Sequence, residues 1–226
     1  MKPLTVKERK KIVFDILTPY YTPKGFKKYL TGGDPGYVFY KDNYAISFFF
    51  NFPQYGNITP GRNLDVTFYE VEDYILKIQF PNTNLESYQD KKRNHIATIH
   101  SKIKGGHRDV IYTPEQAEQV AYDQIASFET EGKAFLDKYP SIVEVFFEMK
   151  RLRREEKYWH EILSGGGEHL FRGLIICKLC NDPEYDKEFE WVSQLINEDD
   201  MLDWQPYWEQ YQELLASLEP KYNCNT

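Results

Sequence analysis

One apolar stretch, residues 44–52 with the sequence YAISFFFNF, most constrains what this chain can fold into. Successive side chains of a β-strand point to opposite faces, so alternate residues of the stretch share one face. That face carries only apolar or aromatic side chains, namely Tyr44, Ile46, Phe48, Phe50 and Phe52. The pattern predicts a core strand on which the rest of a sheet is built.

Further strands are expected before and after this one. Asp42-Asn43 predicts a two-residue hairpin from a strand over residues 37–41, because both residue types tolerate left-handed turn geometry. Residues 95–103 fit either a strand or a helix, and the strand is preferred. Alternation indicates two more strands between residues 52 and 95. One runs through Leu64, Val66 and Phe68. The other follows a turn at Glu72-Asp73 and runs through Tyr74, Leu76, Ile78 and Phe80. Together these predict an antiparallel meander with one partly solvated face.

Helices are expected before and after these strands in the sequence. Residues 5–17 form an amphipathic pattern that ends near Pro19. Thr113-Pro114-Glu115-Gln116 is a helix start, with a capping Thr, Pro in the first turn and Gln closing a capping box. From Lys157 onward the pattern indicates helices alone, and Asp203 is expected to cap the last of them.

These elements predict an α+β protein, in which an antiparallel sheet covered by helices is followed by an all-helical C-terminal part. We assign residues 1–140 to the sheet domain and residues 141–226 to a helical subdomain packed on it. The first residues are rich in Lys and Arg and contain no long apolar run, so neither a signal peptide nor a membrane span is expected. With three Cys and no signal, a cytoplasmic protein is predicted.

Charge divides the chain into two opposite halves. Residues 1–112 hold 17 Lys and Arg against 11 Asp and Glu, whereas residues 113–226 hold 11 against 24. Residues 182–219 contain 12 acidic residues and one basic residue, Lys187. Acidic groups beside aromatic rings suit a basic protein partner. The candidate partner-binding residues are Glu198, Asp199, Asp200, Asp203, Trp204, Tyr207 and Trp208.

The sequence contains no motif that assigns a catalytic, cofactor-binding or metal-binding residue. Cys177 and Cys180 have the C-x-x-C spacing, but a structural zinc site needs four ligands, and only Cys224 and His169 are available nearby. We therefore interpret these two cysteines as structural. His95, His100 and His107 lie in the same region as Glu70, Glu72 and Asp73, yet their spacing does not place them together, and a solvated turn with surface histidines is expected.

The first part of the chain resembles domain-of-unknown-function family 4304 of bacteria over roughly residues 5–150. The resemblance lies in the opening helix leading to Gly25-Phe26-Lys27-Lys28, then Phe39-Tyr40, the strand at 44–52, and the Thr113 helix followed by Phe135-Leu136-Asp137. It implies an α+β sheet with covering helices and no established activity. It also implies a likeness to the small cytoplasmic immunity proteins that accompany bacterial toxins.

Three functional hypotheses follow. The leading one is a non-enzymatic protein-binding module, specifically an immunity protein whose acidic helical end binds a basic toxin domain. The alternative is an enzyme or small-ligand binder with a cleft between sheet and helices. The third is nucleic-acid binding by the basic half, where Lys and Arg alternate with aromatic residues. The oligomeric state is left open.

Overall fold

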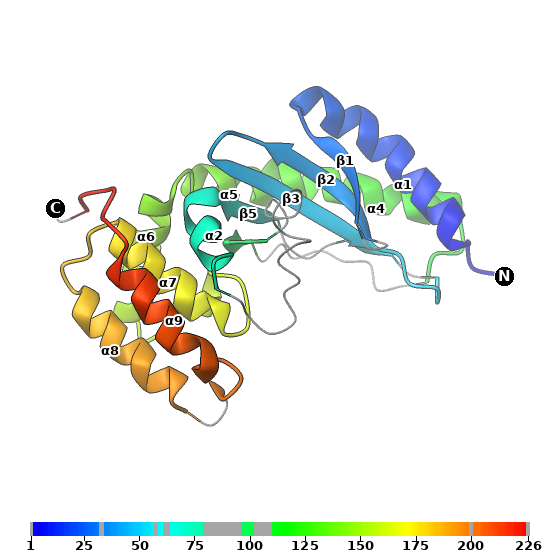
Figure 1. The fold of residues 1–226 in the computed structure, drawn as a ribbon. Helices are drawn as coiled ribbons and strands as arrows, with labels where there is room; N and C mark the ends of the chain where they lie inside the picture. Colours follow the sequence, from blue (N-terminus) through cyan, green and yellow to red (C-terminus); the bar gives the residue numbers. More distant parts are fainter. Residues whose placement is uncertain are drawn as a thin grey trace. The chain divides into compact units, whose positions relative to one another are not determined.

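The chain divides into two compact units, each built from two separate stretches of sequence (Figure 1). This computed structural model describes residues 2–31, 34–56, 58–60, 64–78, 96–101, 110–198 and 201–224. The first unit is formed by residues 1–66 and 100–138, and the second by residues 67–99 and 139–226. The sequence-based division at residue 140 therefore lies near a unit boundary, but residues 67–99 belong with the C-terminal helices.

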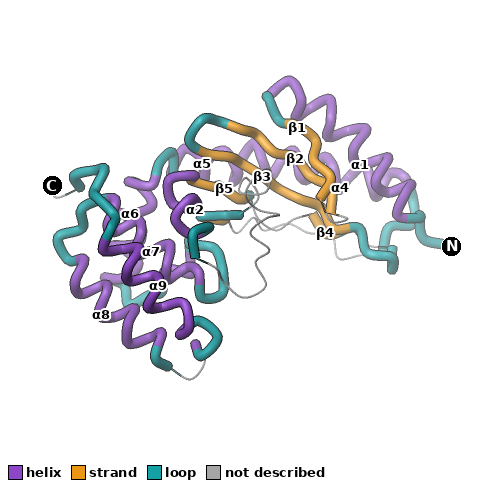
Figure 2. Tube along the Cα trace, in the orientation of Figure 1, coloured by secondary structure: helices purple, strands orange, loops and turns teal. Residues whose placement is uncertain are grey.

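The predicted α+β class is confirmed. Strands β1 (Lys27–Thr31), β2 (Asp34–Tyr40) and β3 (Tyr44–Asn51) pair antiparallel, as the orange segments of Figure 2 show. The sheet order is β1-β2-β3-β5-β6, with β4 (Thr59–Pro60) also pairing with β3. β5 is Asp65–Phe68 and β6 is Ile99–His100, and the division between the units passes through both.

The hairpin between β2 and β3 has the predicted two-residue turn. The backbone amide of Lys41 donates to the carbonyl oxygen of Tyr44 at 2.8 Å, which leaves Asp42-Asn43 as the connection. The left-handed geometry expected for Asp42 and Asn43 is wrong. Among the described residues other than glycine, positive φ occurs at Glu156 and Asn181 instead.

Strand β3 is the core strand that the sequence predicts. α1 (Val6–Tyr21) places its aromatic rings against one face of the strand. Phe14 lies 5.7 Å from Phe50 and Tyr21 lies 4.8 Å from Phe48, measured between ring centroids. Phe128 lies 5.3 Å from Tyr21. Because all these rings are 5% exposed or less, the aromatic cluster is the main apolar core of the first unit.

The two helices of the first unit that the sequence predicts are both present. α1 continues through Pro19 to Tyr21, four residues beyond its predicted end at residue 17. Tyr21 is fully buried, so its packing holds the last turn in place despite the proline. α4 (Pro114–Ser127) begins with the predicted capping box between Thr113 and Gln116. It continues into a π-helical turn (Phe128–Gly132) and α5 (Lys133–Lys138).

The strand predicted from Tyr74 to Phe80 is wrong, because residues Tyr69–Ile75 form helix α2. Val71, Ile75 and Ile78 are buried, and their intervals of four and three residues are those of one face of a helix. The stretch therefore carries a helical pattern in addition to the alternation that predicts a strand. Phe80 lies outside the described residues.

The second unit is arranged around α7 (Glu168–Leu179), of which ten of twelve residues are buried. Helices α2, α6 (Ile142–Arg154), α8 (Tyr185–Ile196) and α9 (Gln205–Ala216) all pack against it (Figure 1). A helix that is apolar all round must be covered on every side, so α7 is the natural centre of this unit. The apolar side chains on the inner side of α6 are all buried, at Ile142, Val145, Phe146, Met149 and Leu152.

A buried ion pair joins α2 to α7. The guanidinium of Arg172 donates to both oxygens of Glu72, at 2.7 and 2.8 Å, and the two side chains are 4% and 0% exposed. Thr98 donates its hydroxyl to Glu72 at 2.7 Å and accepts the amide of Phe68 at 2.9 Å. Arg172 also donates to the carbonyl oxygen of Ser164 at 2.8 Å. The predicted solvated turn at Glu72-Asp73 is therefore wrong, and Glu72 is a structural carboxylate.

Two glycines permit close packing of tryptophan rings in this unit. A Cβ atom at Gly173 would lie 2.0 Å from the buried ring of Trp159, and one at Gly167 would lie 2.4 Å from the ring of Trp204. Trp204 itself stands at the N-cap of α9 without a side-chain capping bond, so the predicted cap at Asp203 is wrong. The tight ring contact at Gly167, instead of a cap, fixes where α9 begins.

None of the helices among the described residues combines the length and the apolar character that crossing a bilayer requires.

Replacing Arg172 with Met should lower the free energy of unfolding of the second unit by about 3–5 kcal/mol, because Glu72 is left as an unpaired buried charge. The change is measured by urea denaturation followed through tryptophan fluorescence, since all four tryptophans lie in this unit. The control is Arg151→Met, which removes the ion pairs of Arg151 to Glu148 and Glu155 and should cost far less, because ion pairs in contact with solvent contribute little to stability. Equal effects of the two substitutions would contradict the assigned role of Arg172.

Replacing Gly173 with Ala should destabilise the same unit by about 1–3 kcal/mol, because the new methyl group overlaps the Trp159 ring. This loss exceeds the gain of about 1 kcal/mol that Ala brings to a helix. Gly166→Ala is the matched control, since no atom lies within 4 Å of a Cβ atom there. A stabilised Gly173→Ala protein in the same denaturation assay would show that the ring contact is not tight.

Candidate functional site

The acidic run at residues 182–219 lies in the second unit, and the structure separates it into two groups with different roles. One group is exposed and in no ion pair among the described residues. We call this group the acidic face; its members are Asp186, Glu190, Glu198, Asp203, Glu209, Glu213 and Glu219. They lie on α8, on α9 and on the segments that adjoin these helices.

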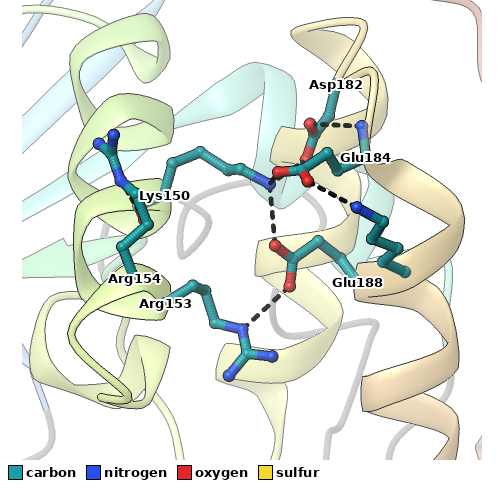
Figure 3. A network of polar contacts seen from close by, with 7 residues as sticks. Lys150, Arg153, Arg154, Asp182, Glu184 and Glu188 are labelled. Atoms are coloured by element: carbon teal, nitrogen blue, oxygen red, sulfur yellow. Dashed lines mark hydrogen bonds and ion pairs between the residues drawn. The ribbon is translucent and has the colours of Figure 1, made fainter.

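The other group binds Lys150 of α6 (Figure 3). The ammonium nitrogen of Lys150 lies 3.2 Å from Asp182, 3.1 Å from Glu184 and 2.9 Å from Glu188. The side chains of Asp182 and Glu188 are 0% and 8% exposed, so a cation is needed beside them. We call these four residues the Lys150 cluster. Three of the 12 acidic residues therefore form structural ion pairs, which connect the start of α8 to α6.

Arg153 extends this cluster by one turn of α6. Its Nε donates to Glu188 at 3.0 Å, and its guanidinium lies 3.6 Å from the centroid of the Trp191 ring. A guanidinium can stack on an aromatic face while it pairs with a carboxylate. Glu188 thereby receives cations from two successive turns of α6, which fixes the rotation of α8 about its own axis.

Protonation in the Lys150 cluster follows from these contacts. Burial by itself lowers the pKa of Lys150, but its hydrogen bonds to Glu188 and Glu184 outweigh this effect and raise the pKa above its ordinary value. Hydrogen bonds from Lys187 and Lys150 lower the pKa of Glu184 from 4.5 to about 2. Lys150 and Glu184 are therefore both ionised at neutral pH.

Beside the Lys150 cluster lies a cleft of about 470 Å³. Phe146 and Phe147 form its apolar part, and Phe147 is 45% exposed. Arg153 and Arg154 contribute positive charge to its lining, and Cys224 reaches it from the C-terminal segment. The volume falls within the range of small-ligand sites, although the lining is more charged than is usual for them.

The predicted partner-binding residues are placed in two different environments. Glu198 and Asp203 are exposed members of the acidic face, whereas Asp199 and Asp200 lie outside the described residues. The aromatic members Trp204, Tyr207 and Trp208 are half-buried.

Packing accounts for the burial of the tryptophan rings. The Trp208 ring stacks on Phe189 of α8 at 5.4 Å, and Trp204 lies 6.1 Å from Phe171 of α7. These tryptophans join α9 to its neighbours and present only part of their surface to a partner. Sequence reasoning missed Leu202, which is 58% exposed between Asp203 and the end of α8 and is the most exposed apolar side chain of this region.

The structure describes some of the remaining candidates for chemistry. Cys177 and Cys180 are buried free thiols. No group of three or more metal-binding side chains occurs within the described ranges. His95 and His107 lie outside those ranges.

In the first unit, lysine side chains lie over aromatic rings, and two of these rings are buried. In the first unit, Lys28 lies 4.2 Å from the centroid of the Phe14 ring and Lys10 lies 5.6 Å from that of Phe52. Both rings are buried, at 5% and 7% exposed. They are therefore closed to stacking with bases.

Stability of the second unit should depend on pH through Glu184. Because folding lowers the pKa of Glu184 to about 2, its contribution is fully present above pH 4.5 and is lost as the pH falls toward 2. Tryptophan-monitored urea denaturation between pH 7 and pH 2 should therefore show a smaller loss of stability on acidification for Glu184→Gln than for the wild type. Glu190→Gln, which changes an exposed carboxylate of α8 that forms no ion pair with the part of the chain that the structure describes, should follow the wild-type profile. Superimposable profiles for the wild type and Glu184→Gln would contradict this assignment.

Comparison with known proteins returned no matching family model, no matching curated protein and no matching solved structure.

Proposed function

We propose that this chain is a protein-binding module whose acidic face binds a basic protein partner. The specific form of the proposal is an immunity protein that neutralises a toxin domain by covering its basic active site. The toxin in this proposal comes from the family resemblance of residues 5–150, whereas the basic character of the partner comes from the acidic face.

The separation of the acidic run into paired and unpaired carboxylates supports the proposal most directly. A run of 12 acidic residues that were all neutralised internally would be a feature of stability alone. Instead, seven exposed carboxylates stay outside any ion pair among the described residues. Their summed field attracts a cationic surface over roughly a Debye length and raises its association rate.

Rigid support beneath the acidic face favours binding further. α8 is held by the Lys150 cluster, and α9 is held by the stacking of Trp208 on Phe189. A preorganised surface loses less conformational entropy on association than a flexible one. Leu202 and the half-buried Trp204, which flank Asp203 in the sequence, offer apolar contact next to an exposed carboxylate, as interface hot spots combine apolar contact with a polar rim.

A small-ligand site is the second candidate, and the cleft beside the Lys150 cluster favours it. Its volume of about 470 Å³ admits a metabolite-sized molecule, and Phe147 with Arg154 offers one apolar and one cationic contact. A thermal-shift screen of metabolites would support this candidate if a hit lost its effect in Phe147→Ala.

Reversing the charge of Glu198, Asp203 and Glu209 to Lys should weaken capture of a basic partner from the native host by at least about tenfold. The loss should arise mainly in the association rate, because the exposed carboxylates act through long-range attraction. Pull-downs with the wild-type and variant chains, quantified by mass spectrometry and followed by surface plasmon resonance on the purified partner, measure the effect.

The matched control reverses Glu118, Glu131 and Asp137, three exposed acidic residues of the first unit. Both triple variants change the net charge equally, so a difference between them reports position instead of total charge. Equal binding by the two variants, or a wild-type pull-down without any basic protein, would overturn the proposal.

A further inference from the structure

The segment that follows α9 is held against the C-terminal end of α7. The amides of Lys221 and Tyr222 both donate to the carbonyl oxygen of Leu179 at 2.9 Å, and the amide of Cys224 donates to that of Cys180 at 3.2 Å. The hydroxyl of Tyr222 donates to the Glu70 carboxylate at 3.0 Å, which anchors the segment from its other side. Cys224 is thereby fixed beside Cys180, although 43 residues separate them in the sequence.

The two thiols are neighbours with very different access to solvent. Cys180 is fully buried, its thiol donates to the carbonyl oxygen of Ile142 at 4.0 Å, and it interacts electrostatically with Cys224. Cys224 is half-buried and lines the cleft beside the Lys150 cluster. Both are free thiols. A disulfide spans roughly 4.4–6.8 Å between Cα atoms, and the direct backbone hydrogen bond keeps the backbones of residues 180 and 224 close together.

We propose that Cys180 and Cys224 are a thiol–disulfide exchange site that reacts with a low-molecular-weight disulfide of the glutathione class entering through the cleft. This site shares no residue with the acidic face, so its reaction requires no partner bound there. Arg154, whose guanidinium is in no ion pair among the described residues, gives the cleft a cation suited to the carboxylates of such a molecule.

The exchange proceeds in two balanced steps. The Cys224 thiolate attacks one sulfur of the small disulfide, so that a mixed disulfide forms and the first small thiol leaves with a proton. Cys180 then loses its proton and attacks the Cys224 sulfur, which forms the Cys180–Cys224 bond and releases the second small thiol. The protein loses two hydrogens, and the small disulfide is reduced to two thiols.

Access and acidity decide the order of attack. Burial raises the pKa of Cys180, and its full burial closes it to an external reagent, so Cys224 reacts first. Cys177 takes no part, because it is fully buried, burial raises its pKa, and its thiol contacts Asp182 instead of a second cysteine. The C-x-x-C pair suggested by the sequence is therefore replaced by a pair formed across the fold.

The bond would close a loop that contains both α8 and α9. Linking residues 180 and 224 restricts the unfolded chain over this whole stretch, which should raise the melting temperature of the second unit by several degrees. Oxidation would thus link the C-terminal segment covalently to the C-cap residue of α7.

Trypsin provides a direct test, because it places each cysteine on its own peptide, at residues 173–178, 179–187 and 222–226. The purified full-length chain is incubated with oxidised glutathione, its free thiols are blocked, and the peptides are mapped by mass spectrometry without reduction. We expect peptide 179–187 joined to peptide 222–226, one remaining free thiol at Cys177, and a higher melting temperature that dithiothreitol reverses.

Two variants make the test specific. Cys224→Ser should abolish both the linked peptides and the rise in melting temperature, whereas Cys177→Ser should retain both. A link involving peptide 173–178, a stable glutathione adduct on Cys224 without a link, or no reaction would each overturn the proposal.

Discussion

The buried ion pair between Glu72 and Arg172 is the interaction on which the second unit depends most. Each side chain alone would be an uncompensated charge in an apolar interior, and together they satisfy one another through two hydrogen bonds. Arg172 lies in the middle of α7, the helix against which α2, α6, α8 and α9 pack. The pair therefore brings α2, from an early part of the sequence, into a unit otherwise made by the C-terminal residues.

A second set of charges, the Lys150 cluster, performs the corresponding task for α8. Without Lys150 the buried carboxylates of Asp182 and Glu188 would repel each other at the start of that helix. With it, the same carboxylates hold α8 in one orientation, and the acidic face is left on the outside. Charge in this unit thus has two separate roles, one internal and structural, and one external and available for attraction.

Sequence reasoning succeeded where the deciding interactions are local. The strand at residues 44–52 and the Thr113–Gln116 capping box involve side chains within a few residues, and both are present as predicted, although residues 45–48 of the strand are all buried. It failed at residues 69–75, where apolar spacing fits two periods and the contact that selects the helix is with Arg172, 100 residues later. The partition of the acidic run was equally invisible, since Lys150 lies 32 residues from Asp182.

The sequence by itself determined the α+β class, the aromatic core strand and the concentration of negative charge near the C-terminus, because composition and periodicity act locally. Only the tertiary structure decided which carboxylates are neutralised, which helix is central, and which cysteines become neighbours. Cys177 and Cys180 share a sequence motif, yet the backbone of the C-terminal segment brings Cys224 to Cys180 instead. Such pairings depend on which distant segments of the chain come into contact in the folded protein, and no local pattern of residues carries that information.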